Sequence, residues 1–257
     1  MFTPLSEVPT NSPILWITLA NKGYGEYVLN FTQSMKRAGA EFKLIVFCID
    51  DEIARMLEGN PHVVCVDARP YIPTNLSNEF SIWGQSQYIA ITFGKVDVMR
   101  VALETGVPYV GYIDTDIVLV RDPTPTALRA FETDPAVQIV AQCGEGRYCT
   151  APNKCPEFCT GVILFRNSPE MQAHLRYTQE DVHANPMGDQ VFLSAVFKRA
   201  NTPSLTIHKD IWIHGGPYGP ISNLSMPKPA DAELYHFNFL IGNEKKEKMK
   251  QMNMWYL

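Results

Sequence analysis

Short apolar runs alternate with helical patterns at the start of this 257-residue chain, and this alternation limits the folds open to it. The runs with the length and composition of buried strands are 14–20, 42–48 and 62–68. Tyr27, Phe31 and Met35 recur at helical spacing between the first two runs, and Gly39 is a typical helix stop. Strands that alternate with helices pair in parallel, because each crossover needs a long connection. We therefore predict an α/β fold with a parallel sheet and helices on its faces.

The rest of the chain continues this pattern with longer interruptions. Residues 69–84 are rich in Pro, Asn and Ser and are predicted to form a loop, which a helix over about 85–104 follows. The further predicted strands are 109–113, 137–142, 161–166 and 233–239, and the further helices are 188–199 and one from Asn243. No internal repeat or domain linker is visible, and the length fits one large α/β domain or two small ones.

Charge and hydropathy exclude some classes of protein. The net charge of −5 argues against a nucleic-acid binder, which normally carries a basic face. No stretch reaches the roughly 18–20 apolar residues that span a bilayer, and residues 1–13 lack the basic start and apolar run of a signal peptide. We expect a soluble protein, either cytoplasmic or the Golgi-lumenal catalytic domain of an enzyme whose anchor is not part of this sequence.

The six cysteines form two groups. Cys48 and Cys65 lie inside apolar runs and are expected to be small core residues. The other four are close together but lack the C-x2-C spacing of a zinc site: Cys143, Cys149, Cys155 and Cys159. We expect free thiols on a loop and its following strand, with two disulfides in an oxidising compartment as the alternative.

Two carboxylates stand between apolar segments in "YVGYIDTDIVLVRDP", residues 109–123. Burying charge without a partner is costly, so Asp114 and Asp116 are expected beside a cation or at an exposed strand end. Residues i and i+2 of an extended segment face the same side, so both carboxylates can bind one cation. Carboxylate oxygens suit Mg²⁺ or Mn²⁺, and the end of a parallel strand is where such folds bind ligands. The alternative is a solvated acidic turn.

The same stretch resembles the Asp-x-Asp motif of sugar-nucleotide glycosyltransferases with the GT-A fold. More specifically, it is similar to the nucleotide-diphospho-sugar transferase family that includes plant rhamnogalacturonan α-xylosyltransferases. Other stretches resemble this family in the same order: Lys95 to "LETG" at Gly106, "CTGVILFRNSP", "MGDQVFL" and "YHFNFLIGNEKKEKMK". The resemblance covers about residues 85–255. One departure is Cys159, which stands where the family usually has Asn before Thr-Gly, so the sugar is less predictable.

The resemblance implies a fold and an activity. The fold would be a single GT-A domain over 1–257 with a Rossmann-like, mostly parallel sheet, a nucleotide-binding half at about 13–122 and an acceptor and catalytic half at about 123–257. The activity would be metal-dependent transfer of a sugar from a nucleotide-diphospho-sugar donor to a glycan or glycoprotein acceptor, with retention of anomeric configuration. Mn²⁺ or Mg²⁺ would be the cofactor.

The resemblance also assigns candidate residues. The metal ligands would be Asp114, Asp116 and His236, although His236 has the alternative of a core histidine. The donor would contact Thr18, Ala20, Tyr24, Lys95, Asp114, Thr115, Gly242, Lys245 and Lys246. Of the two adjacent lysines, Lys246 is favoured for the phosphate. Asp189 and Gln190 would be catalytic, with an ordinary helix N-cap as the alternative for Asp189. Trp212 and Tyr218, in the predicted loop 212–220, would stack on the acceptor.

Two other functions remain as alternatives. Haloacid-dehalogenase phosphatases also place Asp-x-Asp after an apolar strand, but near the start of the catalytic domain and with a later acidic pair. Here more than a hundred residues of β–α pattern precede the motif, and "GDQVFL" has no second carboxylate. The other alternative is a sugar-nucleotide-binding protein that has kept the fold and lost turnover.

Overall fold

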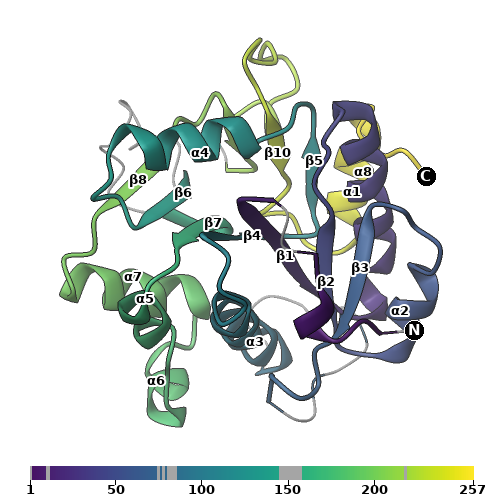
Figure 1. Ribbon diagram of the computed structural model, residues 1–257. Helices are drawn as coiled ribbons and strands as arrows, with labels where there is room; N and C mark the ends of the chain where they lie inside the picture. The colour runs from purple at the N-terminus through teal and green to yellow at the C-terminus, as the bar shows by residue number, and fades with distance from the viewer. Residues whose placement is uncertain are drawn as a thin grey trace. The chain divides into compact units, whose positions relative to one another are not determined.

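The computed structural model describes residues 2–9, 12–73, 76, 79, 86–144, 158–216 and 219–257 (Figure 1). The strands are β1 (Ile14–Ala20), β2 (Leu44–Cys48), β3 (Val63–Asp67), β4 (Tyr109–Ile113), β5 (Ile117–Leu119), β6 (Ile139–Cys143), β7 (Phe158–Arg166), β8 (Ser204–Ile207), β9 (Trp212–His214) and β10 (Leu234–His236). Seven strands form a sheet in the order β3-β2-β1-β4-β7-β6-β8, and three form a sheet in the order β5-β10-β9. The predicted α/β fold with a mostly parallel sheet flanked by helices is confirmed.

Helices connect most of these strands. They are α1 (Gly25–Ala38), α2 (Asp51–Met56), α3 (Ser86–Leu103), α4 (Thr124–Thr133), α5 (Pro169–His174), α6 (Gln179–Ala184), α7 (Asp189–Arg199) and α8 (Asn243–Gln251), with short 3-10 helices η1 (Leu5–Glu7) and η2 (Lys22–Tyr24). Helix α1 ends as predicted at Gly39, whose φ of 67° is a conformation that residues with a Cβ rarely adopt.

The chain divides into two compact units that interleave along the sequence. The first contains residues 1–25, 42–113 and 164–202, and the second contains 26–41, 114–163 and 203–257. The predicted halves, 13–122 and 123–257, are contiguous in sequence, and each of them contributes to both units.

Parallel strands form the centre of the first unit. Strand β1 pairs in parallel with both β2 and β4, and β2 pairs with β3, so the strand order reverses at β1 (Figure 1). All residues of β1 and β2 are buried, as expected for a sheet covered on both faces. Gly111 in β4 has no room for a side chain, because an added Cβ would lie 2.8 Å from the Trp16 ring. Because the strand order reverses at β1, the carboxyl ends of β1 and β4 flank the point where such sheets bind ligands.

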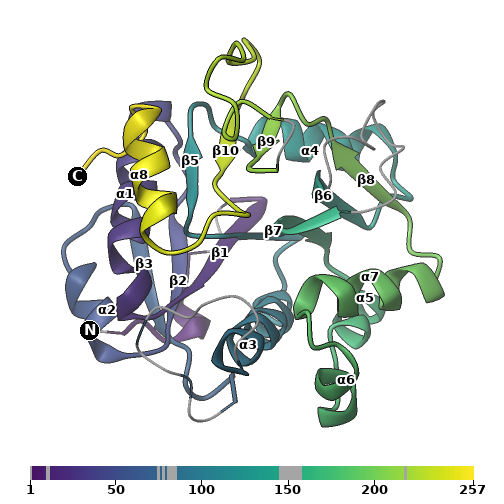
Figure 2. The ribbon, with the colours of Figure 1, turned by 180° about the vertical axis from the view of Figure 1, so that it is seen from behind.

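The second unit places the C-terminal segment against the acidic turn. Strand β10 pairs antiparallel with β5 and in parallel with β9, and its register puts His236 beside Ile117 and His214. Helices α1 and α8 lie side by side, as Figure 2 shows from behind. The Asn30 side chain in α1 connects to the tail, donating to the Met254 carbonyl at 3.0 Å and accepting from the Tyr256 amide at 2.6 Å.

The structure corrects two predictions about the C-terminal third. Residues 212–214, predicted to lie in a loop, form β9, because their backbone pairs with β10. The strand predicted over 233–239 is limited to 234–236, and the φ of 64° at Phe239 rules out extended backbone at the predicted end. Helices α4, α5 and α6 and strand β8 were not predicted.

Part of the cysteine prediction is also wrong. Cys143 is disulfide-bonded, whereas Cys48, Cys65 and Cys159 are free. Cys48 is buried, and Cys65 is partly exposed. Cys149 and Cys155 lie outside the described residues. The alternative of bridged cysteines therefore holds for Cys143.

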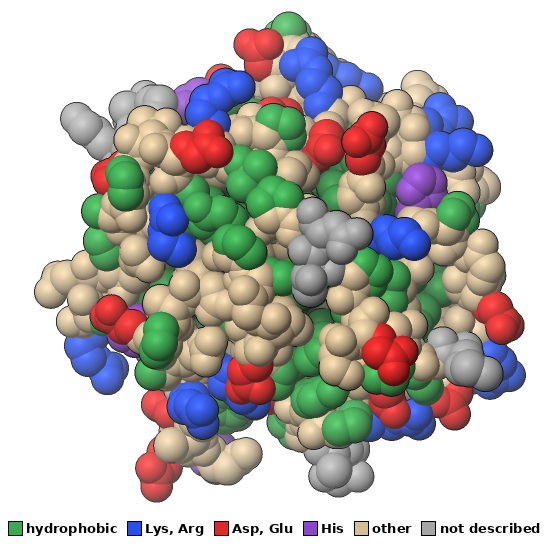
Figure 3. All heavy atoms as spheres, in the orientation of Figure 1, with side chains coloured by type: hydrophobic (Ala, Val, Ile, Leu, Met, Phe, Trp, Pro, Cys, Tyr) green, Lys and Arg blue, Asp and Glu red, His purple; other side chains and the backbone are tan. Residues whose placement is uncertain are grey.

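Lysine and arginine side chains are interspersed with aspartate and glutamate over the face in Figure 3. Within the described ranges, none of the helices has the length and apolar character needed to cross a membrane.

Candidate functional site

The acidic turn is held by strands on both of its sides. Strand β4 ends at Ile113, Asp114 to Asp116 form the turn, and β5 begins at Ile117. The Asp114 amide donates to the Gly161 carbonyl at 2.8 Å, and the Phe237 amide donates to the Asp116 carbonyl at 3.0 Å. Because Ile117 pairs with His236, the register of β5 and β10 brings a histidine from 120 residues away to the turn. Thr115, between the two aspartates, is buried.

Three side chains converge at this turn. His236 Nε2 lies 3.3 Å from Asp116 Oδ1 and 3.6 Å from Asp114 Oδ2. One ligand atom from each of the three residues lies within 4.8 Å of the others. His236 and Asp116 are buried, and the Asp114 side chain is 27% exposed. The constellation that the sequence suggested is therefore compact and opens to solvent at Asp114.

Gly161 in β7 leaves room for these ligands. A Cβ added there would clash with His236 Cε1 and would lie 2.7 Å from Asp114 Oδ2 and 2.8 Å from His236 Nε2. Any larger residue would therefore displace two of the three converging side chains. This is the glycine of the "CTG" motif, and its role follows from close packing against the site.

Charges within the site are strongly coupled. The Lys245 ammonium lies 2.6 Å from Asp116 Oδ2, and both side chains are about nine-tenths buried. Burial alone would raise the pKa of Asp116, but Lys245 and His236 lower it well below its usual range. Burial alone would lower the pKa of His236, but the charge of the neighbouring Asp116 raises it to about 10. The buried carboxylate is thus ionised because cationic groups surround it.

The residues present fit a hard divalent cation. Two carboxylates and one imidazole are ligands that Mn²⁺ accepts, and carboxylates also suit Mg²⁺. The space left by Gly161, the short distances between ligand atoms and the partly open side at Asp114 agree with a site that also leaves room for ligands from a substrate.

Sequence reasoning missed one residue of this cluster. Gln142 in β6 is fully buried, and its Oε1 lies 2.8 Å from His236 Nδ1. The free thiol of Cys159 lies farther from the same nitrogen, at 3.8 Å, and 3.7 Å from the Asn238 amide. The available signal was a single amide in the otherwise apolar run "IVAQC".

The two adjacent lysines have different surroundings. Lys245 binds Asp116, whereas the Lys246 ammonium lies 2.7 Å from the exposed Glu26 and 4.7 Å from the centre of the Trp255 ring. Gly242, the N-cap of α8, has a φ of 55°, and its carbonyl accepts from the Tyr27 hydroxyl at 3.2 Å. The geometry therefore places Lys245, rather than the favoured Lys246, against the acidic turn.

Other predicted residues lie in the first unit. Lys95 in α3 and Asp189 in the first turn of α7 form a buried ion pair, with 3.5 Å between Lys95 Nζ and Asp189 Oδ2. The Lys95 ammonium also lies 4.8 Å from the centre of the Tyr112 ring. The remaining candidates are Gln190, partly exposed in α7, Thr18 and Ala20, both buried in β1, and Tyr24, partly exposed at the end of η2.

Of the two residues predicted to stack on the acceptor, the structure describes only Trp212. Trp212 is fully buried in β9, and its indole N–H donates to Glu233 Oε2 at 2.9 Å, so its ring has no free face for stacking on a sugar. Tyr218 lies outside the described residues.

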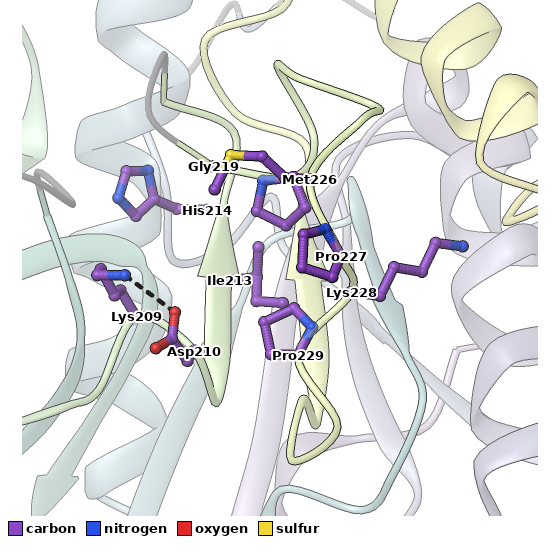
Figure 4. Close-up of a pocket in the computed structure, with 10 residues that line it drawn as sticks. Lys209, Asp210, Ile213, His214, Gly219, Met226, Pro227, Lys228 and Pro229 are labelled. Carbon is purple, nitrogen blue, oxygen red and sulfur yellow. Dashed lines mark hydrogen bonds and ion pairs between the residues drawn. The ribbon is translucent and has the colours of Figure 1, made fainter.

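A cavity of about 310 Å³ lies in the second unit beside β9. In Figure 4, Lys209 and Asp210 line one side, Pro227 and Pro229 line the opposite side, and Lys228 extends away from the others. The full lining is Lys209, Asp210, Ile213, His214, Gly219, Pro220, Met226, Pro227, Lys228 and Pro229. An ion pair at 3.0 Å between Lys209 and Asp210 gives the cavity a polar edge opposite Pro227 and Pro229 (Figure 4).

Comparison with known proteins gives a family and a fold. A profile of the nucleotide-diphospho-sugar transferase family matches residues 42–252. No curated protein sequence matches the chain. Mouse xyloside xylosyltransferase 1 is similar in structure, with a TM-score of 0.54 and 14% identity over 87% of this chain and 97% of that one. Galactosyltransferase LgtC, solved with donor and acceptor sugar analogues, has a TM-score of 0.53 and 13% identity over 93% and 94%. The glycosyltransferase GlyE of Streptococcus pneumoniae is similar in structure with a TM-score of 0.55 and 15% identity, over 91% of this chain and 60% of that one.

Proposed function

Because the chain belongs to the nucleotide-diphospho-sugar transferase family, we propose that it transfers a sugar from a nucleotide-diphospho-sugar donor to a glycan or glycoprotein acceptor, with Mn²⁺ or Mg²⁺ as cofactor and with retention of configuration. The observation that carries this proposal is the cluster of Asp114, Asp116 and His236 around the space left by Gly161. A glycosyltransferase fold alone would not require these groups to converge.

The chemical need is to stabilise a leaving diphosphate. A divalent cation held by Asp114, Asp116 and His236 would neutralise part of the charge that develops when the bond to the sugar breaks. Lys245 is the cation of this chain best placed to add to that effect, since its ammonium already lies at Asp116. The positive end of α8, beginning after Gly242, favours an anion in the same region.

Asp189 and Gln190 remain the proposed catalytic pair. The ion pair with Lys95 supports an ionised Asp189 despite its burial, because a paired carboxylate tolerates a site that water does not reach. An ionised carboxylate can stabilise an oxocarbenium-like state, and the Gln190 amide can hydrogen-bond a sugar hydroxyl. Thr18, Ala20, Tyr24 and Thr115 stay as predicted donor contacts.

The acceptor is proposed to bind at the cavity beside β9. His214, which lines it, pairs in register with His236, so the cavity adjoins the strand that carries the metal ligand. Proline and methionine present apolar surface for the C–H faces of a sugar, and the Lys209–Asp210 pair offers partners for hydroxyl groups. This assignment replaces Trp212 with residues that have accessible surfaces.

Protection from thermal unfolding by a panel of sugar nucleotides with Mn²⁺ tests the proposal. Stabilisation should be selective for one nucleotide and should grow with its concentration. Asp116→Asn should lose this stabilisation while keeping its melting temperature without ligand within a few degrees. Protection by phosphomonoesters without regard to the nucleoside would support the phosphatase alternative instead. Selective protection with no turnover of any donor would support the non-catalytic alternative.

A further inference from the structure

The hydrogen bonds around Gln142 fix which way its amide points. Its Nε2 lies 3.2 Å from the Trp212 carbonyl oxygen and 3.0 Å from the Ile213 carbonyl oxygen. A carbonyl oxygen can only accept, so two of them require the NH₂ group of the amide. The reversed amide would set three oxygens against one another in a fully buried place. Oε1 is therefore the atom that faces His236.

This orientation determines the proton on His236. Oε1 only accepts, and it lies 2.8 Å from His236 Nδ1, so Nδ1 must carry a hydrogen and donate it. With a proton kept on Nδ1, a cation that binds the ring takes the place of the Nε2 proton, and the ring is then the neutral tautomer with its lone pair on Nε2. Nε2 is the nitrogen that lies 3.3 Å from Asp116 Oδ1 and 3.6 Å from Asp114 Oδ2. The lone pair that a bound cation would use thus points to the place where the two carboxylates converge.

We infer that Gln142 is a positioning residue, which fixes the tautomer and the ring orientation of His236 so that Nε2 can bind the divalent cation. The inference rests on the proposed metal-dependent function and concerns a residue outside the three ligands. Buried hydrogen-bond partners of metal-binding histidines commonly act in this way, and their loss weakens metal affinity about 10- to 100-fold.

Two alternative explanations are weaker. Cys159 also approaches Nδ1, but its sulfur lies 3.8 Å away, whereas the amide oxygen of Gln142 lies 2.8 Å away. Sulfur is also a weaker hydrogen-bond acceptor than an amide oxygen. A purely structural role, in which Gln142 only ties β6 to β9, would use Nε2 and leave the short contact of Oε1 unexplained. The amide makes all three hydrogen bonds at once, and each of them constrains the others.

The direct test is the tautomer of His236 in the wild-type protein with saturating Mg²⁺, read from long-range ¹H–¹⁵N NMR of the imidazole. The His236 signals are assigned by their loss in His236→Ala. We expect a protonated Nδ1 that exchanges slowly with water, and an unprotonated Nε2. A protonated Nε2 would overturn the inference without any variant at Gln142 being needed.

The matched variants are Gln142→Met, which keeps the length of the side chain without the amide, and Cys159→Ala, which changes the other neighbour of Nδ1. Titration with Mn²⁺ alone, followed by the EPR signal of the free ion, should show an affinity about 10- to 100-fold lower for Gln142→Met and within about threefold of wild type for Cys159→Ala. Unchanged affinity in a folded Gln142→Met would refute the role. If Asp116→Asn also binds Mn²⁺ like wild type, the metal site itself is wrong, and that outcome is distinct from failure of Gln142 alone.

Discussion

Lys245 and Lys246 offer a prediction that two neighbouring substitutions can separate. Both lysines lie in α8, but the Lys245 ammonium binds the buried Asp116 at 2.6 Å, with side chains 12% and 10% exposed. The Lys246 ammonium binds Glu26, which is 59% exposed. Lys245→Met removes a cation from the metal site, and Lys246→Met removes the same charge outside it. We expect Lys245→Met to tighten Mn²⁺ binding when no nucleotide is present.

The size of the effect follows from the ion pair. Two unit charges 2.6 Å apart attract by about 6 kcal/mol at an effective dielectric constant of 20. Desolvation of the two buried groups offsets most of this attraction. If about a quarter to a half remains as competition with a divalent cation for Asp116, Lys245→Met should bind Mn²⁺ roughly 10- to 100-fold more tightly, since each 1.4 kcal/mol is tenfold.

A nucleoside diphosphate should reverse the order. When the anion is present, the Lys245 ammonium can turn from Asp116 to the phosphate oxygens, so its loss should weaken nucleotide binding in Mn²⁺ by about tenfold or more. In effect, Lys245 would make tight cation binding conditional on the diphosphate. Lys246→Met should behave like wild type in both measurements, since its partner is Glu26.

The assay measures free Mn²⁺ by EPR during titration of each protein, first alone and then with uridine or guanosine diphosphate. Equal Mn²⁺ affinity of wild type and Lys245→Met in the absence of nucleotide would refute the competition. If Lys246→Met, and not Lys245→Met, weakened diphosphate binding, the originally favoured lysine would be the phosphate ligand. Melting temperatures of the three proteins control for loss of folding.

Three further substitutions test other parts of the structure. Gly161→Ala should lower Mn²⁺ affinity at least tenfold with an unchanged circular dichroism spectrum, because the added Cβ would lie 2.7 Å from Asp114 Oδ2. Gly219→Ala is the control, since the atom nearest to its added Cβ would be 3.3 Å away. Equal Mn²⁺ affinities of the two variants would contradict the packing argument. Asp210→Ala should raise the acceptor KM about 3- to 10-fold and leave donor hydrolysis unchanged, and an unaltered KM would remove the cavity from the acceptor site. Burial raises the pKa of Asp97 above its ordinary 3.8, although the Tyr177 hydroxyl and Arg100 both act to lower it. The folded protein is therefore stabilised while Asp97 is protonated, and it loses this stability as the pH rises through the raised pKa. Asp97→Asn, whose amide oxygen can still accept from Tyr177, should therefore gain melting temperature relative to wild type as pH rises from about 4 towards neutral, and a difference that stays constant with pH would contradict this.

Local patterns in the sequence were enough to predict the elements that carry a strong periodic signal. Strand β1 and helices α3 and α7 lie within a residue or two of their predicted bounds, because buried runs and helix stops are local signals. The short strands β8 and β9 have only four and three residues, too few for alternation to distinguish them from a loop. Their pairing depends on residues far away in sequence, and β9 exists because β10 provides its partner.

In the candidate site too, local sequence patterns identified some residues, whereas others depend on contacts between segments far apart in the sequence. Asp114 and Asp116 were visible as a local anomaly, two charges between apolar strands, and His236 followed from a family resemblance. The choice between Lys245 and Lys246 was not accessible to spacing, because the first turn of α8 decides which side chain faces Asp116 and which faces Glu26. Gln142 had only the signal of a polar residue in an apolar strand, which a structural amide would also give.

The geometry also explains why the site depends on so many separate segments. Asp116 is ionised in a buried place only because Lys245 and His236 offset its charge, and His236 has its orientation because Gln142 fills the other side of the ring. Gly161 keeps the remaining side empty for the ligands. A substitution at any of these positions changes the charge or the space seen by the others, so their effects on Mn²⁺ affinity should not add independently. Gln142→Met combined with Gly161→Ala should therefore lower Mn²⁺ affinity by less than the product of the two single effects, since either change alone already misplaces His236. A double variant whose loss equals that product would show that the two residues act on the cation by separate routes.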